Sequence, residues 1–174
     1  MKFSRAFAMP NSETFSIVEI GQFVQRYLSR SNSSIDPFAR NKKLATYTND
    51  LDPNTAANSH EDAEEFCKKL TGGIRVDLAL FDPPYSPRQI SECYKSIGLE
   101  VGMKETQNGA FYKRVRDALD VLVDPGGVVL SFGWNSAGMG KGRGYEIEEI
   151  LMVNHGGAHN DTICLAERKM ERLI

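Results

Sequence analysis

The chain has 174 residues, of which 41% are hydrophobic and 25% charged, as expected for one globular domain of ordinary size with a real core. No apolar run approaches the length of a membrane span, and residues 1–10 lack the apolar core of a signal peptide, so we expect a cytoplasmic protein. The net charge of −2 is unusual for a protein that clamps duplex nucleic acid, so any such surface must be a local patch.

An amphipathic helix is predicted near residues 17–29. Ser16-Ile17-Val18-Glu19 has the form of a capping box, and apolar residues then recur at helical spacing: Ile20, Phe23, Val24, Tyr27 and Leu28. A polar break over residues 29–34 follows. We therefore expect residues 1–34 to form an N-terminal helical segment ahead of the main domain, which begins at residue 35.

A strand and a helix are predicted next along the chain. Residues 44–53 read as a strand that ends in acids, and in Rossmann-type sheets a carboxylate at that point accepts hydrogen bonds from cofactor ribose hydroxyls. Asp50 is the candidate for that role and Asp52 the alternative. Residues 59–63 then lead into a helix with an apolar face, which Gly72-Gly73 ends.

A buried strand over residues 76–81 leads into the turn Asp82-Pro83-Pro84-Tyr85. Its short apolar run ends on a carboxylate and two prolines, which is typical of a parallel strand that delivers residues to a ligand crevice. The prolines stiffen the turn, and the Pro83 carbonyl need not pair with a neighbouring strand. Residues 86–89 open a helix, with a serine cap and a proline at the first helical position.

The remainder of the chain predicts a helix and three further strands. The helix covers about residues 110–123, and a buried strand over 128–133 places Trp134 and Asn135 at its end, on the crevice side of the sheet. Residues 149–154 and 161–167 read as an antiparallel hairpin at the sheet edge. Between them and the preceding strand, a glycine-rich loop over residues 138–144 carries Lys141 and Arg143. That loop favours a flexible lid whose two cations touch a nucleic-acid backbone, and plain disorder is the alternative.

A metal site is not predicted. His155, His159 and Asp161 could ligate an ion, but ordinary turn residues explain that segment equally well. The cysteines, Cys67, Cys93 and Cys164, are odd in number and far apart, which indicates neither a disulfide framework nor a C-x-x-C site.

The turn Asp82-Pro83-Pro84-Tyr85 resembles the catalytic motif of the S-adenosylmethionine-dependent amino-methyltransferases, above all the DNA adenine-N6 enzymes, and the chain as a whole is similar to the small adenine methyltransferases of phages and prophages. An exocyclic amine is a poor nucleophile, because its lone pair spreads into the base ring. Acceptors from a carboxylate and a backbone carbonyl would hold both amine hydrogens and stabilise the charge that grows on the nitrogen. An aromatic ring beside them supplies a stacking face for an extruded base.

The resemblance extends over most of the chain and implies the rest of the site. It implies an α/β fold with a Rossmann-like seven-stranded sheet, mostly parallel with a C-terminal antiparallel hairpin, and S-adenosylmethionine as cofactor. Asp36-Pro37-Phe38 resembles the first cofactor motif, in which the family usually has glycines where Ala39, Arg40 and Asn41 stand here. Asp62 resembles the acidic contact to the cofactor adenine, and Asp82 belongs to the cofactor site as well as to the catalytic turn.

The resemblance also implies a single methyltransferase domain over residues 1–174. The related DNA enzymes that read long sites carry a large target-recognition insert or appendage, and no stretch of this chain is long enough to be one, so we expect no separate target-recognition domain. Specificity for DNA would then come from short loops, a second copy or a recognition subunit, and Tyr85, Trp134, Asn135, Lys141 and Arg143 are the candidate substrate contacts. Two other hypotheses stay open. The same chemistry serves RNA bases or protein glutamine in enzymes with related turns, and a non-catalytic methyltransferase-like subunit would share the fold.

Overall fold

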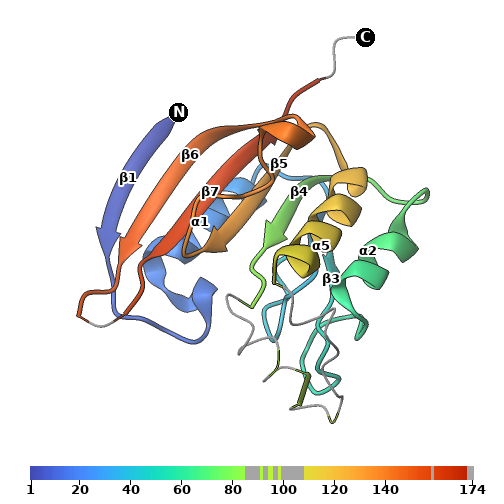
Figure 1. Ribbon diagram of the computed structural model, residues 1–174, viewed down its shortest axis with the longest axis horizontal. Helices are drawn as coiled ribbons and strands as arrows, with labels where there is room; N and C mark the ends of the chain where they lie inside the picture. The colour runs from blue at the N-terminus through green and yellow to red at the C-terminus, as the bar shows by residue number, and fades with distance from the viewer. Residues whose placement is uncertain (85–90, 92–93, 96–97, 99–107, 158, 172–174) are drawn as a thin grey trace.

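The computed structural model describes residues 1–84, 91, 94–95, 98, 108–157 and 159–171. These residues form one seven-stranded sheet in the order β1-β6-β7-β5-β4-β2-β3 (Figure 1). The strands are β1 Lys2–Phe7, β2 Ser34–Asp36, β3 Tyr47–Thr48, β4 Val76–Phe81, β5 Val123–Gly133, β6 Tyr145–Asn154 and β7 Thr162–Lys169. The helices are α1 Val18–Leu28, α2 Ala63–Leu70 and α5 Asn108–Leu122, with 3-10 turns at Thr14–Ser16 and Lys141–Arg143.

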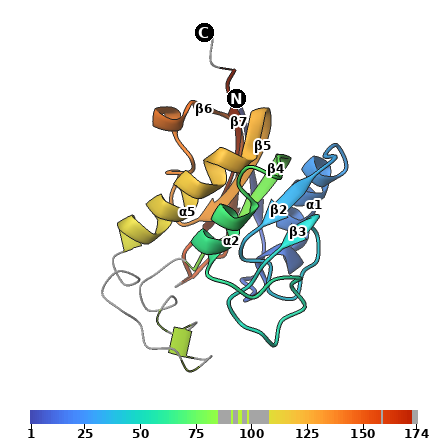
Figure 2. The same cartoon turned by 90° about the vertical axis from the view of Figure 1, so that its right-hand side faces the viewer.

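The sheet is mixed, because β7 runs antiparallel to both of its neighbours, β5 and β6, while the other described pairs are parallel. Helices lie on both faces: α2 and α5 pack on one side and α1 on the other (Figure 2). The predicted fold class, an α/β sheet of seven mostly parallel strands with a C-terminal antiparallel hairpin, is confirmed.

Strand β4 is the centre of both packed layers. Its side chains alternate, so Leu78 and Leu80 face α1, whereas Ala79 and Phe81 face α2 and α5. A strand that is buried on both faces needs an almost continuous apolar sequence, which residues 76–81 provide. Since β2, β3 and β4 are parallel, the loops that follow them emerge at the same end of the sheet.

The N-terminal segment differs from its prediction in two details. Strand β1, which the sequence did not predict, pairs in parallel with β6 and takes the sheet edge that the C-terminal hairpin was expected to occupy. The expected capping box is also wrong. Helix α1 starts at Val18 with Ile17 as its N-cap and no side-chain cap, because Ser16 belongs to the 3-10 turn that runs directly into the helix.

The predicted strand over residues 44–53 is reduced to the two residues of β3. The regular pairing with β2 ends at Thr48, although one further backbone hydrogen bond still reaches the end of β2. Asn49 forms an isolated bridge with Ser59, and its N–H donates to the Asp36 carbonyl at 2.9 Å. No helix in the described parts of the chain is long and apolar enough to cross a membrane.

The glycine-rich loop is fixed to the sheet, so the prediction of a flexible lid is wrong. The carboxylate of Glu167, which is 1% exposed, accepts hydrogen bonds from the backbone N–H groups of Met139 (2.6 Å) and Gly140 (2.9 Å). Arg143 forms an ion pair with Asp117 of α5 at 2.6 Å. Buried charge-assisted hydrogen bonds of this kind anchor the loop instead of leaving it free to open.

Gly138 should be the glycine of this loop that tolerates substitution least. Its φ is +44°, and a Cβ there would lie 2.0 Å from Oε2 of Glu167. Gly138→Ala should therefore lower the free energy of unfolding by about 2–4 kcal/mol, through backbone strain and loss of the Glu167 bonds. Urea denaturation measures the change. Gly142→Ala is the matched control, because nothing lies within 4 Å of that position, and an equal loss in both variants would contradict the role given to Glu167.

Candidate functional site

A cavity of about 410 Å³ lies at the end of the sheet where β2, β3 and β4 finish. Its walls come from the loops after these three strands, from the start of α2 and from α5, with a further contribution from the segment before α1. The lining residues include most of the cofactor and catalytic candidates: Pro37, Phe38, Asp50, Asp62, Asp82, Pro83 and Pro84. Candidate residues that are spread over 48 positions of the sequence, from Pro37 to Pro84, thus lie around one cavity.

The turn after β4 is held in place by α5. Asp82 is half-buried, Pro83 is buried, and the Pro84 carbonyl accepts a hydrogen bond from the hydroxyl of Tyr112. Burial raises the pKa of Tyr112 to about 12, which keeps this hydroxyl protonated and able to donate. The Pro83 carbonyl accepts no hydrogen bond from the residues that the structure describes. Tyr85 lies outside the described residues.

Asp36 is a buried carboxyl group at the end of β2. It is 0% exposed, and its Oδ1 accepts a hydrogen bond from the N–H of Phe38 at 3.0 Å. Its Oδ2 is buried and has no hydrogen-bond partner within the described structure. Burial, reinforced by the charges of Asp82 and Asp50, raises the pKa of Asp36 well above its ordinary value, against the opposing effect of the Phe38 N–H.

Asp50 closes the loop that follows β2. Its Oδ2 accepts from the N–H of Arg40 at 3.0 Å and its Oδ1 from the N–H of Asp52 at 2.9 Å. Arg40 has a φ of +49°, a left-handed conformation that glycine adopts more easily. The backbone therefore takes a glycine-like form at one of the three positions where the sequence resemblance implies glycines. The Arg40 guanidinium donates to the Ser12 carbonyl at 2.7 Å, which attaches the segment before α1 to the cavity wall.

Asp62 caps α2 and also faces the cavity. Its Oδ1 accepts from the N–H of Glu64 at 2.9 Å and of Glu65 at 3.4 Å, and its Oδ2 accepts from the hydroxyl of Tyr94 at 2.9 Å. The helix cap explains why an acid stands here, and the position in the cavity wall is compatible with the predicted ligand contact as well.

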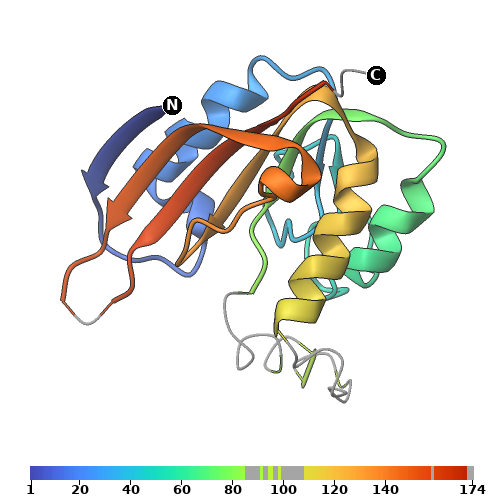
Figure 3. The ribbon, with the colours of Figure 1, turned by 45° about the horizontal axis from the view of Figure 1, so that its top comes forward.

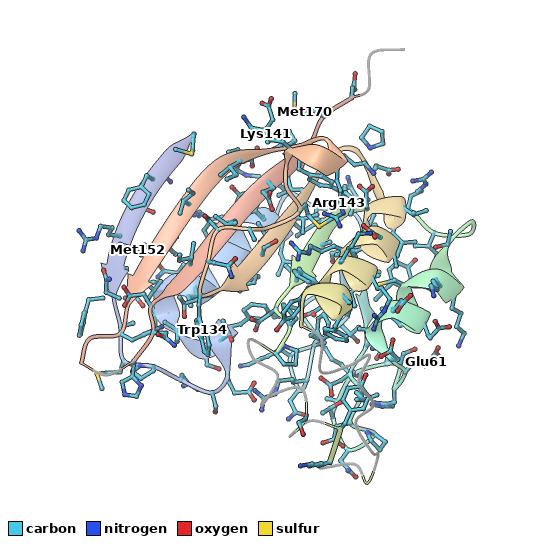
Figure 4. The ribbon with its side chains drawn as sticks, in the orientation of Figure 1. Glu61, Trp134, Lys141, Arg143, Met152 and Met170 are labelled. Carbon is cyan, nitrogen blue, oxygen red and sulfur yellow. The ribbon has the colours of Figure 1, made fainter. Side chains whose placement is uncertain are left out.

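The candidate substrate residues are not gathered with the cofactor candidates. Trp134, which is 44% exposed, lies at the same end of the sheet as the cavity (Figure 4), and Asn135 follows it in the chain. Neither residue lines the cavity. Lys141 and Arg143 lie at the opposite end, beside the start of β6 (Figure 4). Arg143 is committed to Asp117, so its charge serves the packing of the glycine-rich loop.

The metal candidates of the hairpin are also accounted for by packing. His155 is buried, and its ring nitrogens lie 2.8 Å from the Ala8 carbonyl and 2.8 Å from Oγ1 of Thr162. Asp161 accepts hydrogen bonds from the side chain of Asn154 and the N–H of His155. Within the described residues, no cluster of histidine, cysteine or carboxylate side chains could hold a metal ion.

Two structural residues of the site escaped the sequence analysis. Tyr112 lies on the half-buried side of α5. A tyrosine at such a position is expected only to pack against the core, so nothing in the sequence indicated its hydrogen bond to the turn. Asn49 is 0% exposed, and its amide donates to the carbonyls of Pro37 (3.2 Å) and Glu61 (3.0 Å) and accepts from the N–H of Glu61 (3.0 Å). An asparagine directly after a strand was the available signal for such a link.

Comparison with known proteins supports the fold. No protein-family model matches the sequence, and no curated protein sequence is detectably similar to it. Among solved structures, TrmN from Thermus thermophilus has a TM-score of 0.58 at 17% identity, over 88% of this chain and 49% of TrmN. The chain thus spans about half the length of TrmN.

Two further solved structures are similar. The N-methyltransferase NodS from Bradyrhizobium japonicum WM9 has a TM-score of 0.56 at 12% identity, over 87% of this chain and 94% of NodS, and it has also been solved in complex with S-adenosyl-L-homocysteine. NSun6 from Pyrococcus horikoshii has a TM-score of 0.56 at 16% identity, over 84% of this chain and 50% of NSun6. At such identities the likeness establishes a shared Rossmann-like fold.

The raised pKa of Asp36 predicts a pH-dependent gain in stability for Asp36→Asn. The amide keeps an acceptor for the Phe38 N–H and removes the cost of a buried charge. Wild-type stability should fall as the pH rises above about 4, because the unfolded chain then releases a proton that folded Asp36 retains. The variant should consequently unfold at higher urea concentration at pH 7 and match the wild type below about pH 4. An equal difference at both pH values would refute the buried, protonated carboxyl.

Proposed function

We propose that the protein is an S-adenosylmethionine-dependent amino-methyltransferase that methylates the exocyclic N6 amine of adenine in DNA. The observation that carries the proposal is the single cavity in which Pro37-Phe38, Asp50, Asp62 and the turn after β4 meet. Those residues are the ones that the resemblance assigns to cofactor and catalysis, and they converge at the carboxyl ends of parallel strands, where open α/β sheets bind ligands. The same fold in NodS, solved with S-adenosyl-L-homocysteine, supports the cofactor.

The residues of the cavity fit this cofactor. Bound S-adenosylmethionine would supply an electrophilic methyl group on a positively charged sulfonium. Asp36 is completely buried and does not itself line the cavity, but one of its oxygens has no hydrogen-bond partner in the described structure, and the cavity residues Asp50 and Asp82 are close enough to affect its ionisation. A cationic ligand group is what such a set of carboxyl groups would stabilise. Each Asp50 oxygen accepts one backbone hydrogen bond and retains a lone pair for a ribose hydroxyl.

The turn after β4 is suited to positioning an amine. In the proposed reaction the Asp82 carboxylate and the Pro83 carbonyl accept the two amine hydrogens, which aims the nitrogen lone pair and stabilises its growing positive charge. Tyr112 holds the adjacent Pro84 carbonyl, so α5 fixes the direction of the turn. Tyr85 would stack on the extruded base. Trp134 lies at the same end of the sheet, followed by Asn135, where the DNA beside the extruded base could contact them.

We expect the protein to bind its DNA substrate weakly and with little sequence selectivity. The net charge is −2, and Arg143 is already paired with Asp117. The protein therefore offers little of the positive electrostatic potential that attracts a DNA duplex. The proposal gives no role to a lid over residues 138–144. Recognition then depends on short loops around the cavity or on a second subunit.

Cofactor binding can be separated from folding at Asp36 and Asp50. Asp50→Ala should weaken S-adenosyl-L-homocysteine about 10-fold or more, since it removes the ribose acceptors. Asp36→Asn should weaken the ligand too, although it stabilises the free protein at pH 7. Titration calorimetry measures both. Asp124→Asn, at the opposite end of β5, is the matched control and should bind as the wild type does. A wild type that shows no binding at millimolar ligand would favour a non-catalytic subunit.

Catalysis can be tested at Asp82 and Tyr85. Asp82→Ala removes an acceptor aimed at charge that develops mainly in the transition state, so turnover should fall about 10²-fold or more with little change in cofactor affinity. Tyr85→Phe keeps a stacking ring and should retain much of the activity, whereas Tyr85→Ala should lose it.

The assay is mass spectrometry of nucleosides from DNA and RNA of cells that express each variant. N6-methyladenine in DNA is the expected product. A methylated RNA base in place of N6-methyladenine in DNA would show that the substrate is RNA. If neither nucleic acid is methylated, mass spectrometry of the cell's proteins for methylglutamine tests the protein substrate. Wild-type rates in Asp82→Ala would refute the catalytic role of the turn.

A further inference from the structure

The two edges of the sheet differ in how well they are protected. Strand β3, at one edge, has only two residues, which is a common way of blunting an edge. Strand β1, at the other edge, has six residues in regular register with β6 and contains no proline or bulge (Figure 3). Its outer row of backbone N–H and C=O groups pairs with no other strand of the described structure. A long, regular edge of this kind is a template for another strand.

The exposed face of β1 is apolar around one cation. Phe3 and Phe7 are 56% and 65% exposed, with Arg5 between them on the same face. This face continues onto β6 through Ile150 and Met152, the partners of Phe3 and Arg5, and none of the described helices covers it (Figure 1). Aromatic residues, methionine and arginine are the residue types enriched in protein interfaces, where aspartate, glutamate and lysine are depleted.

The backbone of β1 determines how a partner strand could add. The N–H of Ala8 donates to the Asn154 carbonyl of β6, so the even residues of β1 direct their backbone groups towards β6. The odd residues, Phe3, Arg5 and Phe7, direct theirs outward. In an added antiparallel strand these odd residues would form the hydrogen-bonded pairs, and Ser4 and Ala6 would lie in the non-hydrogen-bonded positions.

We propose that β1 pairs antiparallel with β1 of a second copy of this chain, about a twofold axis through Ser4, so that the two sheets become continuous. In this register Phe3 lies directly opposite the partner's Arg5, and Arg5 opposite the partner's Phe3. Two cross-strand cation–aromatic pairs form on the exposed face, and no like charges meet. A shift by two residues in one direction would place Arg5 opposite the partner's Arg5, which like-charge repulsion disfavours. A shift in the other direction would place Phe3 opposite the partner's Phe3 and would lose both cation–aromatic pairs.

A second copy of the chain fits the side chains of this edge better than a single-stranded nucleic acid does. The segment Phe3-Ser4-Arg5 is self-complementary about Ser4, as the isologous interface of a twofold dimer requires. A single-stranded nucleic acid could stack on the two rings, but Arg5 is the one cation that this strand presents on that face, since Lys2 is paired with Glu149 on the other face. The inference does not depend on the proposed chemistry.

Cysteine cross-linking tests the register. The Cα atoms of Ser4 and the partner's Ser4 would be about 4.5 Å apart in a non-hydrogen-bonded pair, within the range that a disulfide spans. Ser4→Cys should therefore form a covalent dimer in the presence of diamide. Ala6→Cys is the matched control on the same strand and face, and it should not, since Ala6 and the partner's Ala6 would lie about 14 Å apart. The unsubstituted chain, with Cys67, Cys93 and Cys164, gives the baseline.

Sedimentation equilibrium tests the association itself. The wild type should reach a monomer–dimer equilibrium, and Arg5→Glu should raise its dissociation constant about 10-fold by removing two cation–aromatic pairs. Arg30→Glu, an exposed cation after α1, should leave that constant unchanged, and circular dichroism should show that both variants are folded. A monomeric wild type would overturn the proposal, as would a dimer that Arg5→Glu does not weaken. Cross-linking of Ala6→Cys but not of Ser4→Cys would overturn the register.

Discussion

The parallel pairing of β2 between β3 and β4 is the constraint on which the candidate site depends. Ile35 pairs with Tyr47 on one side and with Ala79 on the other, and it is 0% exposed. A slip of one residue would turn such a side chain to the opposite face of the sheet, so burial of Ile35 fixes the register of all three strands. The loops that carry the acidic residues then start from fixed points at one end of the sheet.

The site combines several carboxyl groups with little compensating positive charge. The charges of Asp82 and Asp50 add to burial in raising the pKa of Asp36, and Arg40, the one cation among the described residues of the cavity wall, directs its guanidinium to Ser12 and Glu13. A folded protein tolerates such a concentration of acids because the raised pKa of Asp36 favours its neutral form and Asp50 is stabilised by two backbone N–H groups. Unbalanced acidity at a cavity is a physical reason to expect a ligand with a positive centre.

The sequence predicted the features that depend on local pattern. The continuous apolar run of β4 and the period of α1 and α5 each leave a signature within a few residues, and the position of Asp82 directly after its strand follows from the first of them. The sequence did not reveal β1, because its alternation of exposed and half-buried residues acquires meaning only once β6 lies beside it. The anchoring of the glycine-rich loop was missed for the same reason, since Glu167 lies 27 residues beyond Gly140. Long-range contacts of single polar side chains leave no period in a sequence.

Asn49 gives the cavity a property that its charged residues could not. This one neutral side chain joins the loop after β2 to the segment that enters α2, from a completely buried position. An amide does not titrate in the physiological range, and salt does not screen its hydrogen bonds as it screens exposed ion pairs. The spacing between these two walls should therefore stay constant across changes of pH and ionic strength, even while the acids inside the cavity gain or lose protons.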